Sequence, residues 1–222
     1  VGQTALALAG AALLGALALF AVVRWSAPAP PAPRVVRFDI AQPKGLPIAG
    51  APKISPDGRH IAYAARDDKG VARVRLRSLD SSEARPLAGT EGVKTNGRPF
   101  WSPDSRHVAY FTSDTLFKVP IDGGPPQKIS DAAGADASWS EPGTILFDGS
   151  TDAPILGVPA AGGVPKVVVA SGEGKDHDYQ VAWPQFLPGG ERFLFVIFGG
   201  ADSDNGVWIA DADGGRRRRV VA

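Results

Sequence analysis

The sequence has 222 residues, a formal net charge of +1, and neither cysteine nor methionine. The balanced charge argues against a nucleic-acid partner, which needs a strongly basic face. The lack of cysteine excludes disulfides, thiolate nucleophiles and cysteine-based metal sites. Since a natural reading frame supplies at least one methionine, we expect the sequence to be a piece of a longer chain.

The first predicted element is a transmembrane helix over residues 1–25. Thr4 to Val23 is an uncharged, Leu- and Ala-rich run. At about 1.5 Å per residue, a helix of this length matches a hydrocarbon core of about 30 Å. Arg24 and Trp25 follow directly, as expected where a helix meets lipid headgroups. We expect the helix to be retained, because a cleaved signal peptide has a shorter apolar region of about 7–15 residues.

Residues 26–34 form a proline-rich stalk in this interpretation. The run from Ser26 to Pro33 reads SAPAPPAP. Proline at this density excludes a helix and favours the extended polyproline II conformation. The segment is therefore predicted to be a stiff spacer between the membrane and the next domain.

From residue 35 onward, short alternating apolar runs are separated by Pro, Gly, Asp and Ser, as in an all-β sandwich, barrel or propeller. A strand–turn–strand unit recurs as ISPDGRHIAYA (54–64), WSPDSRHVAYF (101–111), WSEPGTILFD (139–148) and FLPGGERFLFV (186–196). A second unit follows each copy, at 76–87, 117–129, 156–168 and 208–221. Four strands in about 45 residues make one propeller blade.

The predicted fold is therefore an all-β propeller over 35–222, with about four four-stranded blades near 41–92, 93–132, 133–173 and 174–222. In the turn from Ser55 to Gly58, Ser caps, Pro presets φ, and Gly tolerates positive φ. Gly-Gly pairs mark the second hairpin of later blades. Alternation predicts burial of Ile61, Tyr63, Val108, Tyr110, Ile145, Phe147, Phe193 and Phe195. The strand predicted at 35–40 could close a ring that has further blades, so we expect the propeller to be incomplete.

The repeats at Ser55–Tyr63 and Ser102–Tyr110 resemble the SPDG-x-x-[IV]-A-[FY] unit of bacterial TolB-like (PD40, WD40-like) propellers. The order of span, stalk and propeller also resembles bacterial receptor-type serine/threonine protein kinases, in phrases such as VVRFDI (35–40) and WPQFLPGGERFLF (183–195). This resemblance implies a kinase domain upstream of Val1. The 222 residues themselves contain no Gly-rich ATP loop, HRD or DFG motif.

Several residues invite a chemical interpretation, but each has a simpler structural one. His60 and His107 occupy the same repeat position, so they are expected one blade apart rather than at a shared metal. His177, flanked by two aspartates, is expected in a surface loop. Asp202 to Gly206 has the alternating oxygen donors of a calcium loop, but Asn205-Gly206 is also a hairpin turn. The basic run from Arg216 to Arg219 is interpreted as a strand-edge charge cluster. No catalytic, cofactor-binding or metal-binding residue is predicted.

The leading functional interpretation is a non-enzymatic sensor or binding module of a membrane-anchored signalling protein. Its partners would be the membrane, through a single span, and a protein or small molecule at the propeller. The propeller is expected outside the cytoplasm. Alternatives left open are the accessory propeller of a prolyl-oligopeptidase-type serine peptidase, the sensor domain of a CadC-type membrane transcription regulator, and a structural envelope protein like TolB. No G-x-S-x-G motif of a serine hydrolase is present.

Overall fold

The computed structural model describes Gly15, Phe20 and residues 48–149, 153–172, 180–199 and 204–221. The chain divides into two units, Val1–Ile40 and Ala41–Ala222. Of the predicted transmembrane helix only Gly15 and Phe20 are described, and both have helical backbone. No helix within the described residues is long and apolar enough to cross a membrane. The rest of 1–25, the stalk at 26–34 and the strand expected at 35–40 lie outside the described residues and remain predictions.

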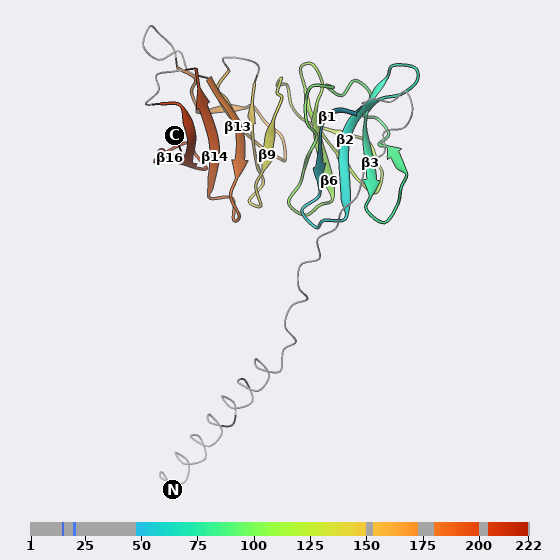
Figure 1. The fold of residues 1–222 in the computed structure, drawn as a ribbon, viewed down its shortest axis with the longest axis horizontal. Coiled ribbons are helices and arrows are strands. Elements are labelled where there is room, and N and C mark those ends of the chain that lie inside the picture. Colours follow the sequence, from blue (N-terminus) through green and yellow to red (C-terminus); the bar gives the residue numbers. More distant parts are fainter. Residues whose placement is uncertain are drawn as a thin grey trace. The chain divides into compact units, whose positions relative to one another are not determined.

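The described part of the second unit is all-β and forms four antiparallel four-stranded sheets in chain order (Figure 1). The first sheet contains β1 (Ile48–Ile54), β2 (His60–Arg66), β3 (Ala72–Ser78) and β4 (Ala84–Pro86), and the second contains β5 (Phe100–Trp101), β6 (His107–Phe111), β7 (Leu116–Pro120) and β8 (Gln127–Ser130). The third contains β9 (Ala137–Trp139), β10 (Thr144–Asp148), β11 (Ile155–Pro159) and β12 (Lys166–Val169), and the fourth β13 (Gln180–Phe186), β14 (Arg192–Phe198), β15 (Gly206–Asp211) and β16 (Arg218–Val221). The predicted propeller of four-stranded blades is confirmed.

The repeated apolar residues of the second, third and fourth sheets lie in the contacts with the preceding sheet. The eight residues predicted to be buried are all at most 2% exposed. Successive side chains of a strand point to opposite faces, so each sheet offers one apolar set to the preceding sheet and another to the next. One core cluster lies at each contact, joining first to second, second to third, and third to fourth sheet. Burying such aromatic and branched side chains stabilises the fold by roughly 1.5–3 kcal/mol each.

The first strand of every sheet lies on the inner side of the assembly. Strand β1 contacts β5, β5 contacts β9, and β9 contacts β13. These contacts between first strands place them around a common axis, as in a propeller. The residues at the ends of these strands therefore come together although they are far apart in the sequence.

The Gly-Gly turns have a second function besides turning the chain. Gly163 N donates to Ile129 O of the preceding sheet at 3.1 Å. Gly214 has a φ of +85°, and a Cβ there would overlap the carbonyl oxygen of Val168 in β12. Glycine is thus required at 214 both by its left-handed backbone and by the close approach of the preceding sheet.

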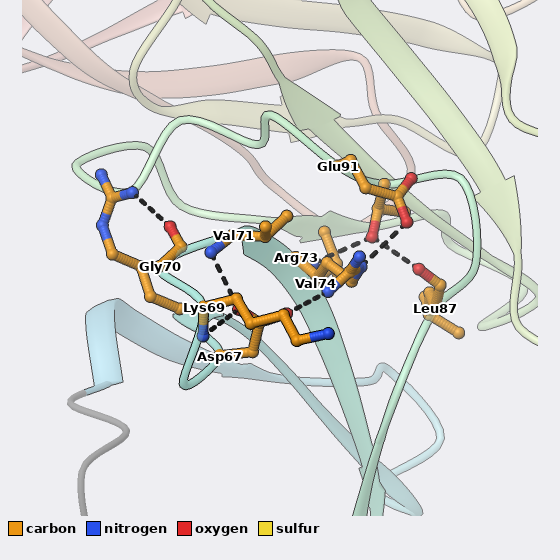
Figure 2. Close-up of polar contacts among 10 residues, drawn as sticks. Asp67, Lys69, Gly70, Val71, Arg73, Val74, Leu87 and Glu91 are labelled. Carbon is orange, nitrogen blue, oxygen red and sulfur yellow. Dashed lines mark hydrogen bonds and ion pairs between the residues drawn. The ribbon is translucent and has the colours of Figure 1, made fainter.

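A cluster of hydrogen bonds and ion pairs links the turn between β2 and β3 to the segment that connects β4 with β5 (Figure 2). Asp67 accepts from Lys69 N at 3.0 Å and Val71 N at 2.9 Å, and pairs with Arg73. Arg73 Nε also donates to Glu91 at 2.8 Å, beyond β4. The hydrogen bond from Val71 lowers the pKa of Asp67, and that from Arg73 lowers the pKa of Glu91. Both carboxylates therefore stay charged at neutral pH.

The neighbouring Thr90 is fully buried and reinforces the same connection. Its Oγ1 accepts from Val74 N at 3.0 Å and donates to Leu87 O at 2.7 Å. The hydroxyl thus satisfies buried backbone groups that would otherwise be costly to leave unpaired. Together with the ion pairs, it holds the start of the segment that leads to β5 at the axis.

Candidate binding pocket at the propeller axis

The last residues of the four axial strands surround a pocket of about 210 Å³. Its lining includes Pro56 and Pro103, which belong to the turns that follow β1 and β5. All four sheets contribute to it, through Lys53, Ile54 and Pro56, through Phe100, Trp101 and Pro103, through Ala137, Ser138 and Trp139, and through Gln185. A concave site shared by several elements is the usual location of a ligand in a propeller or barrel.

Two larger hollows lie elsewhere. One of about 750 Å³ is lined by residues of the fourth sheet and its turns, such as Arg192, Asp211 and Arg216. One of about 310 Å³ is lined by residues of the first sheet, including His60 and Arg85. Each belongs to a single sheet and mixes acidic with basic side chains. The axial pocket alone among these three draws on every sheet, so we take it as the candidate site.

Four pocket residues occupy one and the same repeat position. Lys53 pairs with Ala62, Phe100 with Ala109, Ser138 with Leu146 and Gln185 with Leu194, each opposite the middle of the second strand's motif. The next position is apolar in every copy: Ile54, Trp101, Trp139 and Phe186. One axial position thus carries a cation, an aromatic ring, a hydroxyl and an amide, while its neighbour keeps its apolar character. This variation gives the pocket a mixed chemistry within a regular frame.

The turns that border the pocket are held by their own side chains. Ser55 Oγ donates to Asp57 Oδ1 at 2.6 Å and accepts from His60 N at 2.9 Å. Ser102 makes the same bonds to Asp104 and from His107 N, at the same distances. The serine hydroxyl in each turn lowers the pKa of its aspartate. These turns form a fixed, hydrogen-bonded rim.

The two turns are also joined to each other, and Ser105 supplies the link. Ser105 has a φ of +60°, at the position that Gly58 occupies with +71° in the first turn. Its Oγ accepts a hydrogen bond from Asp57 N at 3.1 Å. The hydroxyl explains why a serine tolerates a backbone conformation that usually favours glycine.

The lining of the pocket carries a single charge, which is positive. Lys53 is half-buried and is the one charged residue among those that line the pocket. Ser138 Oγ accepts from Phe186 N at 3.0 Å and from Gln185 Nε2 at 3.3 Å. Trp101 Nε1 donates to Lys53 O at 2.9 Å, which fixes the strand end that carries the lysine. The arrangement can bind and orient a ligand, but its lining holds no carboxylate or imidazole to act as a general acid or base.

The histidines singled out in the sequence have structural surroundings. The ring of His60 lies 6.2 Å from that of Trp101, and the ring of His107 lies 6.5 Å from that of Trp139. Each histidine therefore packs against the tryptophan of the next sheet, and the two lie at equivalent repeat positions. Among the described residues, no group of three or more His, Asp or Glu could hold a metal.

The remaining sequence candidates fall partly outside the described residues. His177, Asp202 and Ser203 are not described. Asp204 is described, and its carbonyl accepts from Trp208 Nε1 at 2.8 Å. Arg216 pairs with Asp211 at 2.6 Å, while Arg218 and Arg219 lie in β16, at the edge of the fourth sheet.

Sequence reasoning did not identify the axial residues Lys53, Phe100, Ser138 and Gln185. The candidates singled out in the sequence were titratable residues, whereas the pocket is lined mainly by neutral ones. A usable pattern was present in the repeat. The position before the apolar residue that all four copies share changes its chemistry from copy to copy.

Comparison with known proteins supports the fold and leaves the function open. No family model and no curated protein matches the sequence. TolB from Acinetobacter baumannii has a similar structure, with 15% identity, a TM-score of 0.58, and coverage of 77% of this chain and 42% of that chain. An oligogalacturonate lyase in complex with manganese gives 15% identity, a TM-score of 0.61, and coverage of 80% and 54%. Prolyl endopeptidases give 16% identity, a TM-score of 0.56, and coverage of 80% and 29%.

These likenesses define the class of the protein. The chain is an all-β protein with a TolB-like β-propeller fold. It spans between about a quarter and about half of the length of these structures. At such low identity the likeness shows the fold alone, because propellers support many unrelated functions.

Proposed function

We propose that this chain is a non-enzymatic binding module of a membrane-anchored signalling protein, and that the axial pocket is its ligand site. The observation that carries the proposal is the single repeat position occupied by Lys53, Phe100, Ser138 and Gln185. A row of neighbouring axial strands with differing side chains at one end suits selective recognition. The lining offers binding groups without a catalytic pair.

The cysteine-free sequence permits a direct test of the pocket. Gln185→Cys places one thiol at the pocket, and Lys69→Cys places one at the exposed turn between β2 and β3, as a control. The full chain in detergent micelles is screened by thermal unfolding against benzyl alcohol, benzylamine and phenylacetate, before and after labelling with a bulky maleimide. At least one compound should stabilise both unlabelled variants, and labelling at position 185 alone should abolish the effect. If no compound stabilises the chain, or if labelling at 185 changes nothing, the pocket is not the ligand site.

The membrane part of the proposal rests on the run from Thr4 to Val23 and the proline-rich stalk after it. The full chain, expressed in bacteria, is expected to stay with membranes after an alkaline carbonate wash. A chain that begins at Ser26 should be released. Retention of the shortened chain, or release of the full one, would contradict anchoring by residues 1–25. Protease added to intact spheroplasts should cleave the propeller if it faces outward.

The signalling part of the proposal is supported by the resemblance of the span, stalk and repeat to receptor-type serine/threonine kinases. The gene upstream of Val1 provides the test. A Gly-rich loop, an HRD motif and a DFG motif are expected there. A winged-helix DNA-binding domain in their place would instead favour a membrane transcription regulator.

A further inference from the structure

We propose that the ligand of the axial pocket is a small organic carboxylate with an apolar body. The inference rests on the proposed function, because it specifies the chemistry of the same pocket. Its first support is charge. Lys53 lines the pocket, no acidic side chain does, and within the described residues Lys53 has no ion-pair partner. The ammonium group of a half-buried lysine without an ion-pair partner gains most from an anionic ligand.

The aspartates of the turns that border the pocket do not form an ion pair with this lysine. Asp57 and Asp104 belong to the turns that border the pocket, but neither lines it. Each accepts a serine hydroxyl and a backbone amide within its own turn, from Arg59 N and Arg106 N at 3.0 Å. Since Oδ1 of each aspartate is used within its own turn and neither aspartate forms an ion pair with Lys53, the positive charge of Lys53 is left for a ligand.

Ser138 adds a second hydrogen-bond donor. Its hydroxyl oxygen already accepts two hydrogen bonds, from Phe186 N and Gln185 Nε2. A hydroxyl has one proton and two acceptor lone pairs, so the remaining capacity of Ser138 is to donate. An ammonium group and a hydroxyl donor in one pocket match a carboxylate, which is an acceptor-only group.

The rest of the lining calls for an apolar body. Ile54 lines the pocket and is 54% exposed, whereas the equivalent Trp101 and Phe186 are covered by a preceding sheet, which the first sheet lacks among the described residues. Trp139 and two prolines, Pro56 and Pro103, complete this apolar surface. A ligand that covers Ile54 removes apolar area from water and is stabilised by about 25 cal/mol for each Å².

The size of the pocket favours a free small molecule over a peptide. Its volume of about 210 Å³ lies below the roughly 300–1,000 Å³ of sites for drug-sized ligands. One ring or branched chain with a carboxylate fills such a space. A peptide segment would place most of its surface outside the pocket.

Phenylacetate is the probe that tests this chemistry. Isothermal titration calorimetry on the full chain in detergent micelles compares it with benzylamine, benzyl alcohol and the capped peptide acetyl-Phe-Asp-Phe-amide. Phenylacetate should bind at least 10-fold more tightly than uncharged benzyl alcohol, cationic benzylamine or the peptide. Its affinity should fall as the salt concentration is raised. Lys53→Gln should weaken phenylacetate binding by about 10-fold, and Lys53→Arg by less.

Lys69→Gln is the matched control, because it removes the same charge from the exposed β2–β3 turn. It should leave phenylacetate affinity unchanged, and circular dichroism should show that both glutamine variants are folded. Equal affinity for benzyl alcohol or benzylamine, or no effect of Lys53→Gln, overturns the carboxylate inference while the pocket remains a binding site. Tighter binding of the peptide overturns the small-molecule inference. If no probe binds, the proposed function itself fails.

Discussion

The contact between the first and second sheets differs from that between the third and fourth in its polar links. At the first contact, two aromatic side chains donate to backbone carbonyls, Trp101 Nε1 to Lys53 O and Tyr110 Oη to Gly89 O at 3.2 Å, and Ser105 Oγ accepts from Asp57 N. At the third contact, side-chain oxygens accept from backbone amides. Asp148 Oδ2 accepts from Trp183 N at 2.9 Å, and Ser138 Oγ accepts from Phe186 N.

The apolar side chains, by contrast, are alike at both contacts. Tyr110 at the first and Phe195 at the third occupy one repeat position, and each is at most 2% exposed. The repeated apolar residues therefore set the register of every blade. The individual polar links then give each contact its own geometry and its own response to pH. Four predictions test this division.

The largest effect is expected from truncating the shared aromatic position. Tyr110→Ala and Phe195→Ala should each lower the free energy of unfolding by about 3–5 kcal/mol, because each leaves a cavity between two sheets. Ile54→Ala is the control, since Ile54 is 54% exposed, and it should cost less than about 1 kcal/mol. Chemical denaturation measures all three. A cost below 1 kcal/mol at either aromatic position would contradict an equivalent role for the two contacts.

Next in size is a substitution that pushes the third and fourth sheets apart. Gly214→Ala combines a φ of +85° with overlap between the new Cβ and Val168 O, so a loss of roughly 2–4 kcal/mol is expected. Gly58→Ala provides the comparison. Its φ is +71°, but nothing lies within 4 Å of the added Cβ, so it should cost only about 1 kcal/mol. Equal losses would show that the approach to Val168 contributes nothing.

The third prediction concerns Asp148, which is 6% exposed and lies where the other sheets have Ala64, Phe111 and Val196. Its two oxygens accept from Asp136 N at 2.8 Å and from Trp183 N. Asp148→Asn turns one acceptor into a donor that faces a backbone N–H. We expect a loss of about 1–3 kcal/mol in unfolding free energy. Asp148→Glu keeps an ionisable carboxyl group, so the pH dependence of its unfolding free energy should differ from that of Asp148→Asn.

The sign of that pH profile follows from burial. Desolvation raises the pKa of Asp148 above its usual value, and the adjacent Asp136 adds to this. Between the unfolded and the folded pKa the folded state binds more protons, so the contribution of Asp148 declines as pH rises through its folded pKa. The stability difference between the wild type and Asp148→Asn should therefore shrink as pH is raised from about 4. A difference that grows with pH would contradict the raised pKa.

The sequence predicted the repeated apolar residues that are buried between the sheets. It did not predict the individual polar links between one sheet and the next. Alternation and turn residues identify Tyr63, Tyr110, Phe147 and Phe195 as buried, because burial between sheets depends on local periodicity. The link from Asp148 to Trp183 joins residues from two blades, and no local pattern indicates it. The axial pocket was missed for the same reason, since Ser138 and Gln185 meet only when the sheets are assembled.

The smallest effect is expected from Trp101→Phe, which retains an aromatic ring but removes the N–H bonded to Lys53 O together with part of the buried indole ring. Losing one such hydrogen bond should cost about 1 kcal/mol of unfolding free energy. Trp208→Phe is the matched control, because its N–H bonds to Asp204 O within the fourth sheet's own hairpin. Both variants lose one hydrogen bond, but only Trp101→Phe frees the strand end that carries Lys53 and alters a ring that lines the pocket. Calorimetry with phenylacetate should therefore show weaker binding for Trp101→Phe alone. Equal affinities in the two variants would mean that the link between the first and second sheets does not position the cation of the pocket.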